Sequence, residues 1–328
     1  MKLFISTCFL LVLLSFSGVA KAIDIIAHRG ASGFLPEHTK EALVLSFMQG
    51  ADYIEQDLVA TKDKQLIVLH DIHLETVTNV EQMFPSRARD DGRFYAIDFS
   101  LNELRTLSIH EREHTDNTLV YPNRYNGKAH FTVATFQEHV EVIRQLNRAF
   151  GKNVGVYPEI KAPSWHTSQG IDITALFMQA LNDLDLNSAS ANIYVQSFEP
   201  EALKRIRFEY KSKVKLVQLI AENDWNESNT DYDLLKTVQG LDKVAQYANG
   251  IGPWIPHLID EKTNTPTDLI KNAQTLGLVV HPYTYRADLY SDKEEAIRAF
   301  KRLKALGING LFTDQVMPYM HNKNSPSP

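Results

Sequence analysis

The stretch IDIIAHRG, residues 23–30, reads as a buried strand that is followed directly by the polar residues His28 and Arg29. Its consecutive apolar residues Ile25, Ile26 and Ala27 are typical of a strand that is covered on both faces. Residues 39–50 then show a helical pattern that stops at Gly50. The chain repeats this alternation, with further strands predicted at residues 52–59, 66–70, 153–160, 193–196, 214–220, 250–254, 278–282 and 310–313. Strands that alternate with helices predict an α/β fold with a parallel sheet or barrel.

These nine predicted strands are one more than a plain eight-stranded barrel needs. The pair 52–59 and 66–70 is joined too tightly to enclose a helix, which accounts for the extra strand. Residues 74–124 break the alternation, with charged residues, scattered aromatics and no sustained period. Loops of this length usually carry a function or a small fold of their own. We therefore predict an insertion at about residues 74–124 beside the barrel mouth, and a frayed tail at 322–328.

Residues 1–22 differ from the rest of the chain. Lys2 precedes an uncharged, mostly apolar run, Leu3–Phe16, and Ala20-Lys21-Ala22 offers small residues for cleavage. This pattern is typical of a secretory signal peptide, and the run is shorter than the roughly 20 residues that span a bilayer. We predict an exported protein with no stable membrane anchor once the signal is removed, in which residues 23–321 form the barrel. A retained N-terminal anchor is the alternative.

The composition is that of an ordinary globular protein, with 44% hydrophobic and 23% charged residues. The formal net charge is −6 and Lys and Arg form no long basic run, so nucleic-acid binding is not expected. The single cysteine, Cys8, lies in the predicted signal. The exported chain would therefore have neither a thiol nucleophile nor a thiolate metal site, and its stability would rest on a large core.

Acidic side chains occupy two of the predicted strands. Glu55 and Asp57 are two residues apart, so in a strand both leave the same face. Neighbouring buried carboxylates repel each other unless a cation compensates them, and Glu159 on a later strand can add a third. Three hard oxygen ligands suit Ca²⁺ or Mg²⁺. A salt-bridge network with Arg29 and Lys161 is the other interpretation.

Two histidines lie at the ends of predicted strands: His28 ends the first strand and His70 ends the third. Imidazole is suited to proton transfer near neutral pH, so one ring can deprotonate an attacking hydroxyl while the other protonates a leaving alkoxide. Arg29 and Lys161 are fixed cations that suit a phosphate. A lone strand-end histidine is usually structural. Together with the carboxylates, at the strand ends where barrels place active sites, the two histidines predict phosphodiester cleavage.

The same residues resemble the glycerophosphodiester phosphodiesterase family. The matching motifs appear in order over nearly the whole mature chain: AHRGASG at 27–33, PEHT at 36–39, EQDL at 55–58, TKD at 61–63, HD at 70–71, PEIK at 158–161, QSF at 196–198, HPYT at 281–284 and FTD at 312–314. The export signal and the HPYT segment look most like the periplasmic bacterial branch. His38 and Lys64 depart from the commoner family pattern, which has Asn and Gly there, but neither change removes a proposed catalytic group.

The resemblance implies a (β/α)₈ TIM-type barrel with a small inserted subdomain and a bound divalent cation. Ca²⁺ is the expected ion, with Mg²⁺ as the alternative, and Glu55, Asp57 and Glu159 are its implied ligands. The implied reaction converts a small glycerophosphodiester and water into an alcohol and sn-glycerol 3-phosphate. The resemblance sets neither the preferred head group nor an oligomeric state.

By the same match, the functional side chains divide into two groups. His28 and His70 form the general acid–base pair. The implied phosphate and substrate contacts are Arg29, Lys161, Gln196, His281 and Tyr283. Two alternatives stay open at this point: a phospholipase D-like or phosphoinositide-cleaving barrel enzyme, and a non-catalytic periplasmic binding or surface protein on the same fold.

Overall fold

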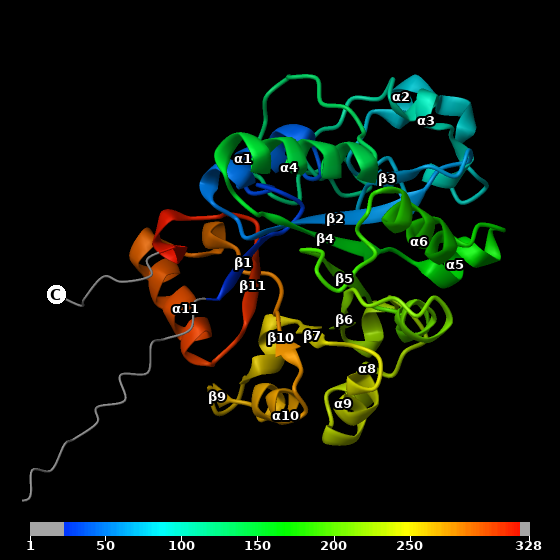
Figure 1. Ribbon diagram of the computed structural model, residues 1–328. Coiled ribbons are helices and arrows are strands. Elements are labelled where there is room, and N and C mark those ends of the chain that lie inside the picture. The colour runs from blue at the N-terminus through cyan, green and yellow to red at the C-terminus, as the bar shows by residue number, and fades with distance from the viewer. Residues whose placement is uncertain (1–22, 322–328) are drawn as a thin grey trace, which may run out of the picture.

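The structure, a computed structural model, describes residues 23–321 of the 328-residue chain (Figure 1). The predicted export signal, residues 1–22, and the predicted tail, residues 322–328, lie outside the described residues. None of the helices within residues 23–321 combines the length and the hydropathy that a membrane span requires.

Eight parallel strands form a sheet that curves into a barrel (Figure 1). In their order along the sheet, the strands are β10 (Val279–Val280), β7 (Gly250–Pro253), β6 (Lys215–Ile220), β5 (Tyr194–Ser197), β4 (Gly155–Ile160), β2 (Tyr53–Ala60), β1 (Asp24–Ala27) and β11 (Gly310–Thr313). The Phe312 N–H donates to the Pro282 carbonyl at 3.0 Å, and the Tyr285 N–H donates to the Phe312 carbonyl at 2.8 Å. These bonds join the two end strands, and the predicted barrel is confirmed.

The ninth predicted strand is β3 (Leu66–Val68), which pairs antiparallel with β2 and lies off the barrel path. The connection between the two strands is a tight turn in which Lys64 has a φ of 60°. The prediction that this hairpin accounts for the extra strand is therefore confirmed. A second, two-stranded antiparallel sheet of β8 (Ile259–Asp260) and β9 (Thr265–Pro266) is a feature that the sequence pattern did not reveal.

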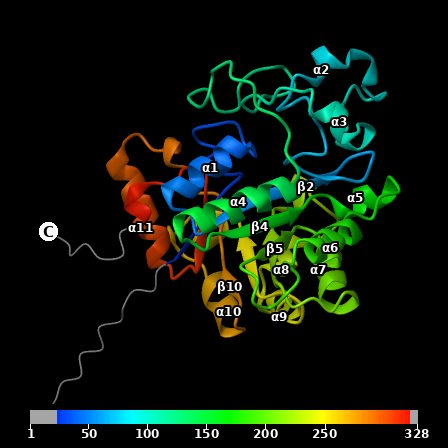
Figure 2. The same ribbon diagram turned by 45° about the horizontal axis from the view of Figure 1, so that its top comes forward.

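Helices cover the outside of the barrel (Figures 1 and 2). They are α1 (Lys40–Gln49), α4 (Phe136–Phe150), α5 (Pro163–Ser168), α6 (Ile173–Asp183), α7 (Pro200–Lys204), α8 (Tyr232–Leu235), α9 (Val238–Ala245), α10 (Leu269–Thr275) and α11 (Lys293–Ala305). The hydroxyl oxygen of Thr39 accepts the Ala42 N–H at 3.1 Å, so Thr39 caps α1. Gly50 ends the helix with a φ of 95°, a conformation that glycine adopts at no steric cost.

Side chains of the barrel strands alternate between an outer and an inner core. In β1, Ile25 packs in the outer cluster beneath the helices, whereas Ile26 packs inside the barrel. In β2 and β4, Tyr53 and Tyr157 also point inward. Because successive inward positions are two residues apart, the same alternation directs the side chains of Glu55, Asp57 and Glu159 toward the barrel axis, closer to the carboxyl ends of their strands.

The segment between β3 and α4 contains the predicted insertion and lies beside α1 and α4, next to the β2–β3 hairpin (Figure 2). It carries two short helices, α2 (Val80–Met83) and α3 (Leu101–Leu104). Its apolar side chains form a separate cluster together with hairpin residues: Val59, Ile67, Leu69, Leu74, Val77, Val80, Phe94, Ala96, Phe99, Leu104, Leu107, Ile109, Phe131 and Val133. The segment therefore has its own small core, which extends past the predicted limits of 74–124.

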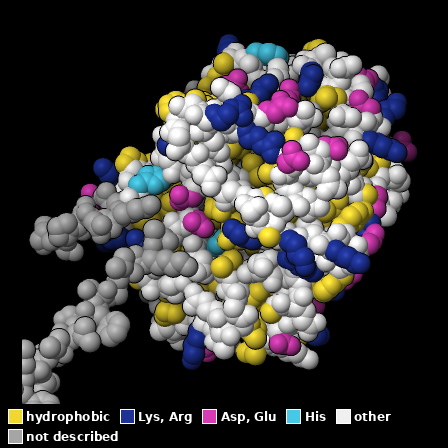
Figure 3. Space-filling view, in the orientation of Figure 1, with side chains coloured by type: hydrophobic (Ala, Val, Ile, Leu, Met, Phe, Trp, Pro, Cys, Tyr) yellow, Lys and Arg dark blue, Asp and Glu magenta, His cyan; other side chains and the backbone are white. Residues whose placement is uncertain are grey.

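Charged side chains are mixed on the molecular face that Figure 3 shows. Lys and Arg side chains lie interspersed with Asp and Glu side chains, and they form no continuous basic patch on that face. The mixture of charges on this face agrees with the net charge of −6.

Candidate active site at the carboxyl ends of the strands

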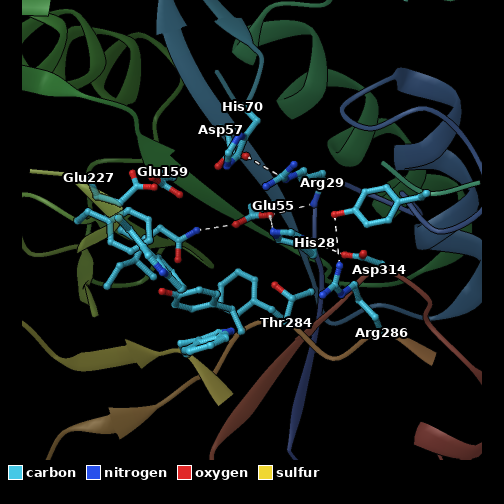
Figure 4. Close-up of a pocket in the computed structure, with 18 residues that line it drawn as sticks. His28, Arg29, Glu55, Asp57, His70, Glu159, Glu227, Thr284, Arg286 and Asp314 are labelled. Atoms are coloured by element: carbon cyan, nitrogen blue, oxygen red, sulfur yellow. Dashed lines mark hydrogen bonds and ion pairs between the residues drawn. The ribbon is translucent and has the colours of Figure 1, made fainter. Parts of the chain in front are cut away.

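A cavity of about 240 Å³ lies at the carboxyl ends of the barrel strands (Figure 4). Acidic, basic and aromatic side chains line it: His28, Arg29, Glu55, Asp57, His70, Tyr121, Glu159, Gln196, Phe198, Leu219, Trp225, Glu227, Trp254, Tyr283, Thr284, Arg286, Phe312 and Asp314. All of the predicted site residues except Lys161 and His281 belong to this lining. Strand ends that are far apart in the chain thus meet in one cavity, as expected of a barrel.

Three buried carboxylates lie together in the cavity. Glu55, Asp57 and Glu159 each offer an oxygen within 4.8 Å of the others. The parallel register of β2 and β4 sets Asp57 directly beside Glu159, and Glu55 precedes Asp57 by one strand repeat. The Nε2 of His38 lies 2.8 Å from one oxygen of Asp57, while the other oxygen, Oδ1, is buried and has no hydrogen-bond partner. The triad therefore has oxygen lone pairs to spare.

The charges in the triad are only partly compensated by the protein. Burial and the charges of Asp57 and Glu159 raise the pKa of Glu55 well above its usual range. Burial also raises the pKa of Glu159 to about 8, although Lys161 opposes that shift. Asp57 differs, because His38 holds its pKa well below the usual range in spite of burial. A divalent ion would relieve this repulsion, and carboxylate oxygens are the ligands that Ca²⁺ and Mg²⁺ prefer. The buried triad thus fits a metal site.

The salt bridges of the alternative interpretation are also present. The Nζ of Lys161 lies 2.9 Å from Glu159, and the Nε of Arg29 lies 3.6 Å from Asp57. Arg29 also donates its backbone N–H to Glu55 at 2.9 Å, from a left-handed conformation with a φ of 58°. Non-glycine residues adopt that conformation at a cost, and such strain concentrates at functional sites. Arg29 and Lys161 therefore border the triad. The pKa values of Glu55 and Glu159 are raised in spite of these two cations, so the negative charge of the triad is only partly compensated.

The two histidines meet at this cavity, and each is held by a carboxylate. The Nδ1 of His28 lies 2.6 Å from Asp314, and the Nδ1 of His70 lies 2.6 Å from Asp71. The Nε2 of His28 faces the triad, 3.7 Å from Glu55. Burial and the charge of Arg29 lower the pKa of both rings, that of His70 to about 3. Both rings are thus neutral at pH 7 and able to accept a proton.

The predicted substrate contacts Gln196 and Tyr283 line the cavity, whereas His281 does not. The Nε2 of Gln196 donates to Glu55 at 2.7 Å, and the hydroxyl of Tyr283 donates to the Ile220 carbonyl at 2.8 Å. His281 is only 1% exposed, and its Nδ1 lies 2.9 Å from the Tyr157 hydroxyl inside the barrel. The substrate role expected for His281 stays a prediction: His281 lies one inward position deeper in the barrel than Tyr283, which is the residue at the level of the cavity.

Several lining residues had no role in the sequence interpretation. Arg286 lies a few residues beyond β10, and its Nε is buried without a hydrogen-bond partner. Trp225 and Glu227 come from the connection after β6, and Tyr121 comes from the inserted segment. The predicted site residues were identified because they are polar side chains at the ends of predicted strands. The four residues above lie on loops with no such signal, so only the folded chain brings them to the cavity.

The chain is similar to known proteins over most of its length. The profile of the glycerophosphoryl diester phosphodiesterase family matches residues 28–317. The chain belongs to this family. A glycerophosphodiester phosphodiesterase of Haemophilus influenzae is 40% identical over 317 residues, which cover 88% of this chain and 86% of the relative. One of Treponema pallidum is 36% identical over 323 residues, which cover 91% of each chain. The predicted class of enzyme, a phosphodiesterase that acts on glycerophosphodiesters, is confirmed by this membership.

Solved structures of the family show the same fold. That of a glycerophosphodiester phosphodiesterase from Agrobacterium tumefaciens superimposes with a TM-score of 0.60 at 18% identity, over 91% of this chain and 99% of the other. That of an Oleispira antarctica phosphodiesterase, in complex with the product sn-glycerol-3-phosphate, has a TM-score of 0.57 at 19% identity, over 89% and 92%. At these identities the likeness supports the barrel and its topology, which agree with the order of the strands described above.

Proposed function

We propose that the protein hydrolyses small glycerophosphodiesters, such as glycerophosphocholine, to an alcohol and sn-glycerol 3-phosphate. The observation that carries the proposal is the meeting of a carboxylate triad and two carboxylate-held imidazoles in one cavity. Family membership and the product in the Oleispira structure support the same substrate class. The cavity has a volume of about 240 Å³ and is lined mainly by charged and aromatic side chains, a setting that suits a small, polar diester.

Ca²⁺ is the proposed ion and Mg²⁺ the alternative, with Glu55, Asp57 and Glu159 as ligands. The support is the hardness of three carboxylate oxygens and the unpaired Oδ1 of Asp57. We place the mature enzyme in the periplasm, as in the periplasmic branch of the family, because residues 1–22 have the pattern of an export signal. A protein in that compartment would recover glycerol phosphate from head-group diesters outside the cytoplasm.

The roles of the side chains follow from their placement. When bound, the metal ion supplies positive charge to the phosphoryl oxygens in the transition state. Arg29 and Arg286 line the same cavity and can hold the phosphate by charge-assisted hydrogen bonds. One neutral imidazole accepts the proton of the attacking hydroxyl, and the other, which must first take up a proton from solvent, gives that proton to the leaving alkoxide so that the alcohol leaves as a neutral molecule. Asp314 and Asp71 keep the two rings oriented throughout.

The attacking hydroxyl has two possible sources. In the first route, the free 2-hydroxyl of the glycerol attacks phosphorus, the alcohol leaves with a proton, and water then opens the cyclic phosphate. In the second, water attacks directly. We propose the first route, because the 2-hydroxyl is already tethered beside phosphorus. A 2-deoxy analogue is then expected to bind but to resist hydrolysis, which is measured by release of its head group. Hydrolysis of this analogue at the full rate would rule out the cyclic route.

A turnover assay with a chelator tests the function. The full chain, incubated with glycerophosphocholine, is expected to release choline and sn-glycerol 3-phosphate in equal amounts. Dialysis against EDTA is expected to remove nearly all of this activity, because the triad then lacks the charge that the transition state requires. Added Ca²⁺ is expected to restore it. Measuring both products by coupled assays separates hydrolysis from binding.

The same assay distinguishes the other functions. A non-catalytic binding protein would bind glycerophosphocholine saturably and release no choline. A phospholipase D-like enzyme would act on phosphatidylcholine and leave the deacylated diester intact. Activity that survives exhaustive chelation would contradict the metal assignment while leaving the substrate class in place.

A further inference from the structure

Each histidine of the cavity is linked through its carboxylate to an arginine. Asp71 accepts from the Nη1 of Arg112 at 2.5 Å with the oxygen that does not contact His70. Asp314 accepts from the Nη2 of Arg124 at 2.6 Å, again with the oxygen that does not contact the imidazole. Each carboxylate is thus held at both oxygens, by a ring on one side and a guanidinium on the other, and the Thr76 hydroxyl adds a longer hydrogen bond of 3.2 Å to the Asp71 oxygen that binds Arg112.

Both arginines come from the inserted segment and not from the barrel. Arg112 is largely buried, and it also makes two hydrogen bonds to Glu37, at 2.6 and 3.0 Å. Arg124 is nearly fully buried; its Nε donates to Asp288 at 2.9 Å, and its guanidinium lies 3.7 Å from the centre of the Tyr121 ring. One short stretch of the insertion, residues 112–124, therefore reaches the partners of both histidines.

The charge on the two carboxylates decides which ring nitrogen carries the proton. His70 and Arg112 hold the pKa of Asp71 well below its usual range in spite of burial. His28 and Arg124 do the same to the pKa of Asp314, which falls to about 2. An ionised carboxylate only accepts hydrogen bonds, so the Nδ1 of each histidine must be the donor. In a neutral ring, the Nε2 is then left as the proton acceptor that faces the cavity.

We propose that Arg112 and Arg124 are positioning residues, through which the inserted segment orients His70 and His28 for proton transfer. The inference rests on the acid–base roles proposed above for the two histidines. A carboxylate held by one hydrogen bond can rotate and accept water, whereas one anchored at both oxygens keeps the imidazole in a single orientation and tautomer. The insertion thereby couples its own folding to the competence of the site.

The segment offers an internal comparison for this role. Arg89 belongs to the same insertion and forms a two-point ion pair with Asp98, at 2.7 and 2.8 Å, but neither residue lines the cavity. An Arg89→Gln variant therefore removes the same kind of interaction from the same segment without touching a histidine partner. It controls for loss of activity through general destabilisation of the insertion.

The experiment compares Arg112→Gln, Arg124→Gln and the corresponding lysine variants with Arg89→Gln. With saturating Ca²⁺ and glycerophosphocholine, we expect the two glutamine variants to lower kcat with KM little changed. The expected loss is about 10–100-fold, the size seen when the outer partner of a metal-ligating histidine is removed. The lysine variants are expected to recover part of that loss, because an ammonium supplies the charge but cannot bridge two carboxylates. Arg89→Gln is expected to keep the wild-type kcat.

Two further measurements separate positioning from stability. In a His70→Ala background, Arg112→Gln is expected to cause no additional loss of kcat, because its partner ring is gone. ¹⁵N spectra of the histidine side chains, which report the tautomer without any turnover, are expected to show mixed tautomers for His70 in Arg112→Gln and for His28 in Arg124→Gln.

Wild-type kcat in either glutamine variant would overturn the proposal for that arginine. An equal loss in Arg89→Gln, or a full additional loss in the His70→Ala background, would overturn it as well. If Arg124→Gln does not fold, Arg124→Lys takes its place, and unchanged kcat and tautomer in that variant would contradict the bridging role. A wild-type enzyme without turnover would instead refute the proposed function, while the spectra would still test the orientation of the rings.

Discussion

Replacing His70 or His28 by alanine is expected to lower kcat for glycerophosphocholine by about 10²–10⁴-fold, the usual contribution of a general acid or base. Both rings line the cavity and have a carboxylate on Nδ1, and the Nε2 of His28 lies 3.7 Å from Glu55 of the triad. Substrate affinity is expected to change little, because the phosphate contacts proposed for Arg29 and Arg286 remain. Single-turnover rates and equilibrium binding, measured on the same samples, check both statements.

A matched control is His73→Ala, three residues after His70. His73 does not line the cavity and packs against Tyr95, with ring centroids 4.5 Å apart. This variant is expected to retain wild-type kcat. Because the two catalytic rings act as a unit, the double variant His28→Ala/His70→Ala is expected to be little slower than the worse single variant. Undiminished rates in both single variants would show that neither ring transfers a proton.

The parts of the fold that are periodic in sequence could be predicted well. All nine strands are found within a few residues of their predicted limits, because apolar runs of short length alternate with helical patterns. The spacing of Glu55 and Asp57 was sufficient to place both side chains on one strand face, and the structure confirms that Glu159, the predicted third carboxylate, lies beside them. The register between the parallel strands β2 and β4 places Glu159 beside Asp57, and the sequence of one strand alone does not specify that register.

The parts that escaped prediction depend on contacts between distant segments. Arg112 and Arg124 occupy a stretch with no period, so nothing in the sequence marked them as partners of strand-end carboxylates. His281 and Tyr283 belong to one predicted strand-end motif, and only the structure shows that Tyr283 lines the cavity while His281 lies deeper in the barrel. Motifs identify the strand ends, whereas depth along the barrel axis and loop contacts decide which side chains meet.

Removing one carboxylate of the triad is expected to abolish most metal binding without unfolding the protein. In Glu159→Gln, the loss of one partner from a buried ionic cluster is expected to cost about 3–5 kcal/mol of Ca²⁺ binding, or at least about 10²-fold in Kd. Burial raises the pKa of Glu159 against the opposing charge of Lys161, which favours the neutral state of this carboxyl when no metal is bound. The neutral amide resembles that state, and the metal-free variant is expected to keep the wild-type Tm.

The stabilisation that Ca²⁺ adds to the wild type, which grows with the logarithm of its concentration over Kd, is expected to vanish in Glu159→Gln at the same concentration. Glu227→Gln is the matched control, since Glu227 lines the same cavity and loses the same charge but lies outside the triad. Calorimetric titration of Ca²⁺ and thermal unfolding with and without the ion measure both effects. If Glu159→Gln bound Ca²⁺ as tightly as the wild type, or if Glu227→Gln weakened it equally, the cation would be held elsewhere in the cavity and Glu159 would serve only as a partner of Lys161.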